Sequence, residues 1–125
     1  MNEELQQLAD HCFEISQEVL AMNGEFHPFG AFIGESGRVH PLGIELEPKN
    51  IPNNGQIINQ LINLAKELGI ENYALCFEVS IQLSEDTPPT DAICVNFTYP
   101  ESPKFYQPFN KSEDELNFEE IFGVK

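Results

Sequence analysis

Basic residues are scarce in this chain of 125 residues, which has six Lys and Arg against 21 Asp and Glu and a net charge of −15. Nucleic acids and anionic membranes are themselves negative, so they would repel such a surface. We therefore expect no nucleic-acid partner and no membrane partner. A basic protein would instead be attracted and steered at low salt. The alternative is that the acidic surface serves only to keep the protein soluble.

Cysteine and long apolar runs are also in short supply. Three cysteines are too few for a disulfide framework, and we expect Cys12, Cys76 and Cys94 to be small buried side chains. No stretch approaches the roughly 20 apolar residues that span a bilayer. The first four residues, Met-Asn-Glu-Glu, are acidic where a secretory signal would be basic and then apolar. These features predict a cytoplasmic protein.

The sequence also lacks the short motifs that carry common chemistry. It has no phosphate-binding Gly-Lys motif, no metalloprotease His-Glu motif and no cysteine redox pair. The segment Gly34-Glu35-Ser36-Gly37 lacks the full spacing of a nucleophile turn and is better explained as a hairpin turn. We expect no cofactor and no metal site. A non-enzymatic role is favoured, although enzymatic activity stays open.

What is present is acid at both ends of the chain. Residues 1–25 carry six acids and no base, and residues 112–125 carry five acids and one base. The C-terminal acids alternate with apolar residues, a pattern typical of a segment that folds onto a partner or docks on its own domain. We predict that these acids contact a basic protein; they are Glu113, Asp114, Glu115, Glu119 and Glu120.

Apolar periodicity predicts two amphipathic helices. The first runs from Glu3 to Met22 and ends at Asn23-Gly24. The second begins after a cap at Asn53 or Asn54, continues to about Leu68 and ends at Gly69. Between them, two strand-like runs on either side of residues 34–37 predict a hairpin.

A second hairpin is predicted by two alternating runs, 73–83 and 92–99, joined by a loop with two prolines. Closure about the middle of the loop would pair odd positions with odd positions. That register places Cys76 near Thr98 and Cys94 near Ser80, with both apolar sets on one face. The other face has small residues and one charge, so we expect the chain's own helices to cover it, or alternatively a second copy in a homodimer.

The predicted fold is α+β, with an antiparallel sheet of about five strands flanked by helices in the order α-β-β-α-β-β-β-(α). The fifth strand is placed at 105–109. The capping-box spacing of residues 112–115 predicts a short last helix through Phe122. We expect one domain, 1–125, with residues 111–125 as a docked or mobile acidic segment.

The order of elements resembles the roadblock, longin and profilin-like group of folds, and the hairpin at residues 29–39 is similar to their first hairpin. The stretch Phe26-His27-Pro28-Phe29-Gly30-Ala31-Phe32-Ile33, with Asp91-Ala92-Ile93-Cys94-Val95, more specifically resembles small bacterial proteins of unassigned function. That resemblance covers about residues 26–109. It implies a fold but no catalytic residues.

Two histidines begin similar four-residue segments, His27-Pro28-Phe29-Gly30 and His40-Pro41-Leu42-Gly43. The expected hairpin places His40 near Ala31, roughly 13 Å along the strand from His27, which is too far for a shared metal. Two functions therefore remain. One is a non-enzymatic interaction module, specifically an immunity-like inhibitor of a basic partner. The other is a ligand-binding or catalytic pocket near His27 and His40, bordered by Phe26, Phe29 and Tyr106.

Overall fold

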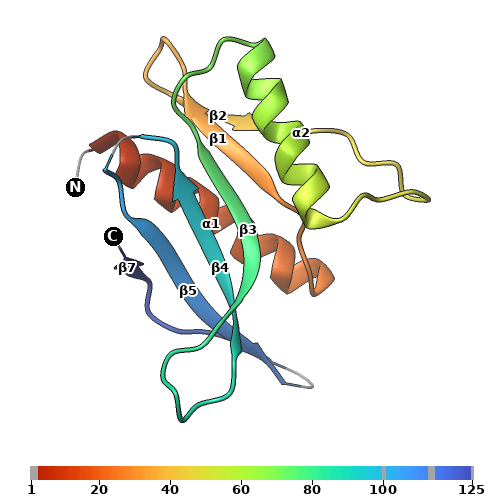
Figure 1. Cartoon of the computed structure of the whole chain (residues 1–125), viewed down its shortest axis with the longest axis vertical. Coiled ribbons are helices and arrows are strands. Elements are labelled where there is room, and N and C mark those ends of the chain that lie inside the picture. Colours follow the sequence, from red (N-terminus) through yellow and green to blue (C-terminus); the bar gives the residue numbers. More distant parts are fainter. Residues whose placement is uncertain (1–2, 100, 113–114, 125) are drawn as a thin grey trace.

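The computed structural model describes residues 3–99, 101–112 and 115–124, which form two helices and a seven-stranded sheet. The elements are α1 Glu3–Asn23, β1 Phe29–Ile33, β2 Val39–Leu42, α2 Asn54–Glu67, β3 Ala74–Ile81, β4 Thr90–Phe97, β5 Lys104–Lys111, β6 Leu116–Phe118 and β7 Phe122–Val124. All neighbouring strands are antiparallel, in the order β2-β1-β3-β4-β5-β6, and β7 also pairs with β5 (Figure 1). The α+β class is confirmed, but the sheet has two strands more than expected.

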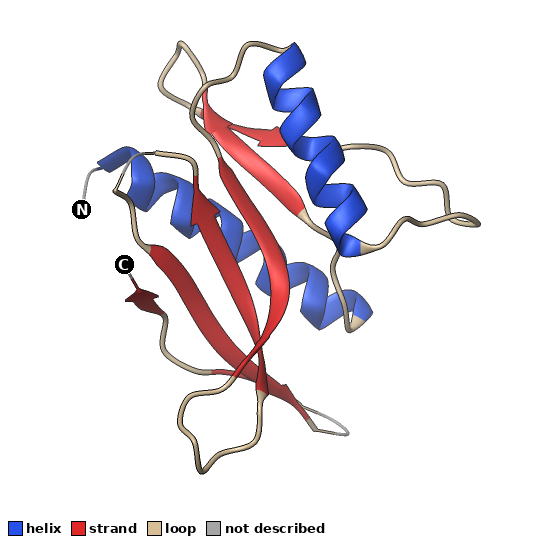
Figure 2. Cartoon of the chain, viewed as in Figure 1, coloured by secondary structure: helices blue, strands red, loops and turns tan. Residues whose placement is uncertain are grey.

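The two helices lie on opposite faces of the sheet (Figure 2). Helix α1 buries its apolar stripe, including Leu8 and Cys12, against a core that contains Ile93 and Val95 of β4. It ends as predicted, with Gly24 at a φ of +77° that glycine adopts without strain. Burial of this stripe by the hydrophobic effect holds α1 on the sheet.

Helix α2 covers only part of the opposite face, over β1, β2 and the edge of β3. Its N-terminus has the predicted cap, because the Asn53 side chain accepts a bond from the Gln56 amide at 2.9 Å and the Gln56 side chain accepts from the Asn53 amide at 3.0 Å. A second apolar cluster lies beneath this helix and consists of Leu42, Ile57, Leu61, Ala65, Tyr73 and Leu75. Among the residues that the structure describes, none forms a helix over the rest of this face (Figure 1).

The first hairpin forms where expected, with its register shifted by one residue. His40 pairs with Phe32, not with Ala31. The turn is longer than the four residues that the sequence suggested, because the Gly34 amide bonds to the carbonyl of Arg38 at 2.9 Å. Gly37 has a φ of +82° in this turn, which explains the second glycine of the segment.

The predicted register of the central hairpin is wrong. Cys76 pairs with Val95 and Phe77 pairs with Cys94, so odd positions meet even positions. The reason lies in the loop: Ile81 pairs with Thr90, which leaves eight residues between the strands. Side-chain bonds from Gln82 to the carbonyls of residues 85 and 87, at 3.4 and 3.0 Å, hold this loop. A shift of one residue reverses the face to which every side chain points.

This register changes what the alternation means. The apolar set of β3, at odd positions, faces the α2 side, whereas the apolar set of β4 faces α1. The small even-numbered residues of β3 do lie beneath a helix: Ala74 and Cys76 are fully buried in the α1 core. All three cysteines are buried and unpaired, as the sequence predicted.

The predicted last helix is also wrong, because the described part of that segment forms β6 and β7 on the outer edge of β5. Ser112 and Glu115, the two ends of the predicted capping box, exchange backbone hydrogen bonds at 2.8 and 3.3 Å and do not cap a helix. Pairing satisfies the backbone groups that β5 would otherwise expose at an edge. Leu116 and Phe118 pack against the α1 core.

Among the described residues, no helix combines the length and the apolar character needed to cross a membrane.

Candidate functional site

Helix α1 presents a strip of carboxylates to solvent along its whole length. Its apolar residues occupy one side and are buried, and the acids fall on the other side through the 3.6-residue period. The exposed acids of α1 are Glu3, Glu4, Asp10, Glu14 and Glu18. Helix α1 itself contains no Lys or Arg, so these charges have no basic neighbour on their own element.

A short polar chain ties the C-terminal segment to α1. The Gln17 side-chain amide donates to the Gln107 side chain at 2.7 Å. Gln107 is buried in β5 and donates in turn to the backbone carbonyl of Glu119 at 3.0 Å. The Glu119 amide is held as well, by the carbonyl of Pro108 at 2.9 Å. The tail is therefore fixed close to the helix by buried or partly buried hydrogen bonds.

The two acidic ends of the chain consequently lie on one side of the molecule. Asp10 of α1 and Ile121 of the tail line the same small hollow of about 190 Å³. We call the exposed acids of α1, together with Glu115, Glu119 and Glu120, the acidic edge. Glu113 and Asp114, which the sequence also nominated, fall outside the described residues.

The structure does not bring the two histidines together. His40 is exposed and stacks on Phe32 with ring centroids 5.4 Å apart. His27 precedes β1 and lies five residues from Phe32, roughly 16 Å along an extended chain. In the part of the chain that is described, no three His, Cys, Asp or Glu side chains gather in a way that could hold a metal ion.

The aromatic residues proposed for a histidine pocket are dispersed too. Phe26 is buried in the α1 core and packs edge-on against Phe29 at 6.0 Å. Tyr106 lies on the α2 side of the sheet and stacks on Phe122 at 5.7 Å. These rings stabilise the fold in different places, so the predicted lining of a single pocket is not assembled.

A different hollow, of about 460 Å³, opens at the end of the molecule where α1 begins. Four segments that are distant in sequence contribute to it. A short sequence motif could therefore not have predicted this hollow. Glu4, Glu35 and Glu71 stand around an apolar lining that includes Phe32 and Ile70. The described lining of this hollow offers carboxylates and apolar surface, and it includes no Lys, Arg or His.

Tyr99 also lines this hollow and interacts with one of its carboxylates. Its hydroxyl donates to the Glu4 carboxylate at a long 3.5 Å. Burial, and then the negative charge of Glu4, raise the pKa of Tyr99 above its usual range. The hydroxyl therefore stays protonated at neutral pH and serves as a donor.

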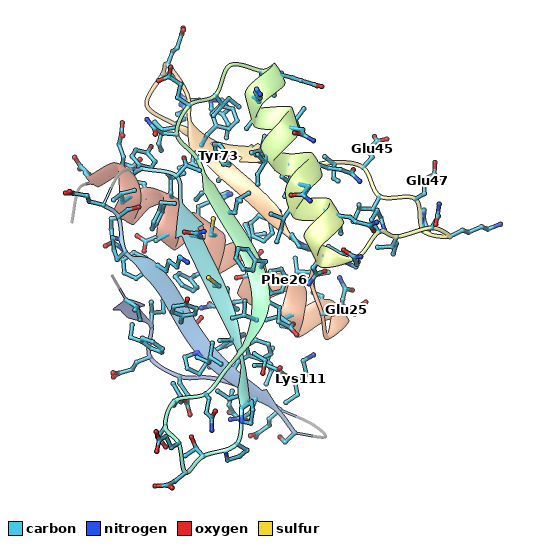
Figure 3. All side chains as sticks on the ribbon, in the orientation of Figure 1. Glu25, Phe26, Glu45, Glu47, Tyr73 and Lys111 are labelled. Carbon is cyan, nitrogen blue, oxygen red and sulfur yellow. The ribbon has the colours of Figure 1, made fainter. Side chains whose placement is uncertain are left out.

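A further carboxylate is placed beside the sheet near the end of α1. Burial raises the pKa of Glu78 in β3, and the charge of Asp91 adds to the effect, while Lys111 opposes it. Lys111 donates to the carbonyl of Gly24 and lies 5.9 Å from the centre of the Phe109 ring. Its ammonium thus caps the negative end of α1 (Figure 3).

The part of the sheet that α2 leaves uncovered forms a third candidate surface, which we call the open face. It consists of the side chains of β3, β4, β5 and β7 that point to the α2 side beyond that helix, namely Val79, Ile81, Ala92, Cys94, Asn96, Lys104, Tyr106, Pro108, Phe122 and Val124. A hollow of about 270 Å³ on this face is lined by Ile81, Leu83, Tyr106, Phe122 and Val124, together with Gln82. The surface is therefore apolar and indented.

Cys94 lies at the centre of the open face but offers no nucleophile. It is almost fully buried between its neighbours. Burial is the main cause that raises its pKa to about 11, with Lys104 and Tyr106 opposing the shift. The thiolate, which is the reactive form, is therefore scarce at neutral pH.

Comparisons with protein-family models, curated proteins and solved structures gave no match. The function must therefore be argued from the surfaces just described.

Proposed function

We propose that this chain is a non-enzymatic protein-interaction module that binds a basic protein through its acidic edge. The observation that carries the proposal is the convergence of the two acidic ends. The chain Gln17–Gln107–Glu119 holds the C-terminal segment beside α1, so acids from residues 3–18 and 115–120 face solvent on one side.

Charge balance supports the same partner chemistry. Even if each of the six basic residues neutralised one carboxylate, 21 − 6 = 15 acids would have no basic residue of their own. A basic partner would release this repulsion on binding and would be steered to the edge over a distance set by the ionic strength. The predicted signature is an association rate that falls steeply with salt.

A specific form of this proposal is an immunity-like inhibitor. In that case the carboxylates of the edge would cover the basic active site of a nuclease and occupy the positions of substrate phosphates. Glu119 and Glu120 suit that role because the first is anchored through its backbone while both side chains are exposed. An anchored carboxylate loses less conformational entropy on binding than a free one.

The test uses the purified chain to retain basic proteins from a native lysate and then measures the affinity of the purified partner at about 50 and 300 mM salt. We expect Kd to rise at least tenfold between these conditions. The fourfold variant Glu14→Gln, Glu18→Gln, Glu119→Gln and Glu120→Gln should weaken binding by a further factor of ten or more at low salt. A nuclease partner should also lose activity when the chain is added.

The matched control removes acids elsewhere. Glu45 and Glu47 lie on the loop after β2, at the far side of α2 (Figure 3). The variant Glu45→Lys and Glu47→Lys changes the net charge by the same four units. Equal weakening by this variant and by the fourfold variant would show that total charge matters and not the acidic edge.

A second candidate is the binding of a small cationic ligand in the hollow ringed by Glu4, Glu35 and Glu71. The apolar lining and the carboxylates together suit an amine or guanidinium on an apolar stem. This binding would be lost in Glu35→Gln and Glu71→Gln, whereas the acidic-edge variant would retain it. His40 contacts this region through Phe32, which lines the hollow, while His27 takes no part.

A further inference from the structure

We propose that the open face is the interface of a symmetric homodimer. Three of the large apolar side chains that the described chain leaves exposed gather on its hollow: Leu83, Phe122 and Val124 are 53%, 36% and 48% exposed. An apolar, indented patch of this kind on a soluble protein marks a surface that another surface covers.

The charge pattern identifies the occupant as a second copy. On a chain of net charge −15, the described strand positions of the open face hold one charged residue, and it is basic, Lys104. A basic partner would find no carboxylate on these strands to recruit it. The described strand positions of this face carry none of the chain's carboxylates.

The two ends of the face are also complementary to each other. Lys104 lies at the end of β5 next to Val124, whereas the loop that carries Glu85 and Asp86 lies at the opposite end, beyond the Ile81–Thr90 pair. About six residues of strand, or roughly 20 Å, separate the ends. A two-fold axis across the strands places Lys104 of each copy against the acidic loop of the other, as an isologous interface requires.

The remaining elements are compatible with this arrangement. Helix α1 lies on the other side of the sheet, so the acidic edges of the two copies point away from each other (Figure 2). Helix α2 packs on β1, which lies three steps from β5 in the sheet, and twist of roughly 20–25° per step turns the faces of these two strands by about 60–75°. Helix α2 therefore points away from the hollow between β3 and β7.

The size of the face predicts a weak dimer. Four strands about 4.8 Å apart and roughly 20 Å long give a footprint near 400 Å² per copy, at the low end for specific interfaces. Contacts of this size are typical of weak, transient association, so the dimer should form only at high protein concentration. Because two copies of charge −15 repel, salt should strengthen the dimer, which is the opposite of its effect on a basic partner.

The first experiment is sedimentation velocity of the full chain from about 5 μM to 1 mM at 50 and 300 mM salt. We expect a monomer–dimer equilibrium that shifts toward the dimer at high salt. Leu83→Asp should raise Kd at least tenfold, and Leu68→Asp should leave it within twofold. Both leucines are exposed, so neither change should prevent folding, and Leu68 lies at the end of α2.

A charge exchange then tests the two-fold arrangement. Lys104→Glu alone, and Glu85→Lys with Asp86→Lys alone, should each raise Kd about fivefold or more, because each creates two like-charge contacts. The triple variant should recover most of the lost affinity. Lys49→Glu makes the same charge change as Lys104→Glu on the loop before α2 and serves as its control.

Three results would overturn the proposal. One is a monomer throughout at 1 mM. Another is a dimer that Leu83→Asp does not weaken. The third is a triple variant that dimerises no better than either charge reversal. Because binding of a basic partner runs through the opposite side of the sheet and has the opposite salt dependence, failure of the dimer leaves that proposal standing, and the reverse also holds.

Discussion

Removing the Gln107 amide should detach the C-terminal segment from α1 while leaving the main sheet folded. The substitution Gln107→Leu keeps the shape of the side chain but deletes the bond it accepts from Gln17 and the bond it donates to the Glu119 carbonyl. Net loss of a hydrogen bond costs about 1 kcal/mol, and the carbonyl of Glu119 also loses its partner. We expect the free energy of unfolding to fall by about 2 kcal/mol.

That cost can be measured in two ways. With an unfolding entropy near 2.1 cal/mol/K per residue, 2 kcal/mol lowers Tm of 125 residues by roughly 8 °C. Native-state hydrogen exchange is more specific. The Glu119 amide, which bonds to Pro108, should exchange roughly 30-fold faster, while amides of β3 and β4 change only with global stability.

Two controls distinguish the loss of this particular bond from a general effect of the substitution. Gln60→Leu changes an exposed amide on α2 and should alter the free energy of unfolding by less than about 0.5 kcal/mol. A double-mutant cycle of Gln17→Ala with Gln107→Leu should give a coupling near 1 kcal/mol. A change below 0.3 kcal/mol for Gln107→Leu, with unaltered exchange at Glu119, would refute the reasoning that this side chain anchors the tail.

Two further predictions test other parts of the structure. Burial raises the pKa of Glu78 above its ordinary value of 4.5, so this carboxyl ionises at lower pH in the unfolded chain than in the folded one. Stability therefore falls as pH rises from 4.5 through the folded pKa. Glu78→Gln should raise Tm at pH 7 and lose this advantage near pH 4. Gly30→Ala should destabilise the protein by about 1–3 kcal/mol, because a Cβ there would lie 2.7 Å from the Ala74 carbonyl oxygen. At Gly43 an added Cβ would meet nothing within 4 Å, so Gly43→Ala should be neutral or slightly stabilising. A urea titration of both variants measures the difference.

Local signals predicted the helices and the class of the fold well. The apolar stripes of α1 and α2, the Asn53 cap and the glycines that end both helices act within a few residues, so they can be read without the rest of the chain. The turn at residues 34–37 was found for the same reason. The length of this turn is not predicted correctly. The bond between the Gly34 amide and the Arg38 carbonyl adds one residue to the turn and so shifts the register of the hairpin by one residue.

The central register and the tail could not be read in this way, for two different reasons. Alternation along β3 suggests one buried face, yet helices pack on both faces, so Leu75 and Cys76 are each buried by a different helix. In the tail, the spacing of Ser112 and Glu115 suits a helix cap, but the free edge of β5 offers strand pairing instead. Tertiary partners override local preference in both places.

The candidate sites show the same division. The acidic residues at both ends of the chain are visible in the sequence. The structure brings those ends together through Gln107, which belongs to no recognisable motif. The open face depends on the true register and on the partial coverage by α2, whereas the sequence predicted helices, or alternatively a second copy, over the even-numbered face of both strands. The repeated His-Pro pattern at His27 and His40 shows the opposite: it is visible in the sequence, but the fold does not bring the two histidines together.

Because α1 precedes every strand of the sheet in the sequence, it is synthesised before the strands that cover its apolar stripe. Its apolar stripe packs against strands that end at Phe97, about 74 residues after the helix is complete. At 5–20 residues per second the ribosome needs roughly 4 to 15 s to produce them. Over that interval Leu5, Leu8, Phe13 and Leu20 have no sheet to cover them. The carboxylates on the other side of the helix repel those of neighbouring nascent chains, which opposes aggregation through the apolar stripe until the sheet has formed.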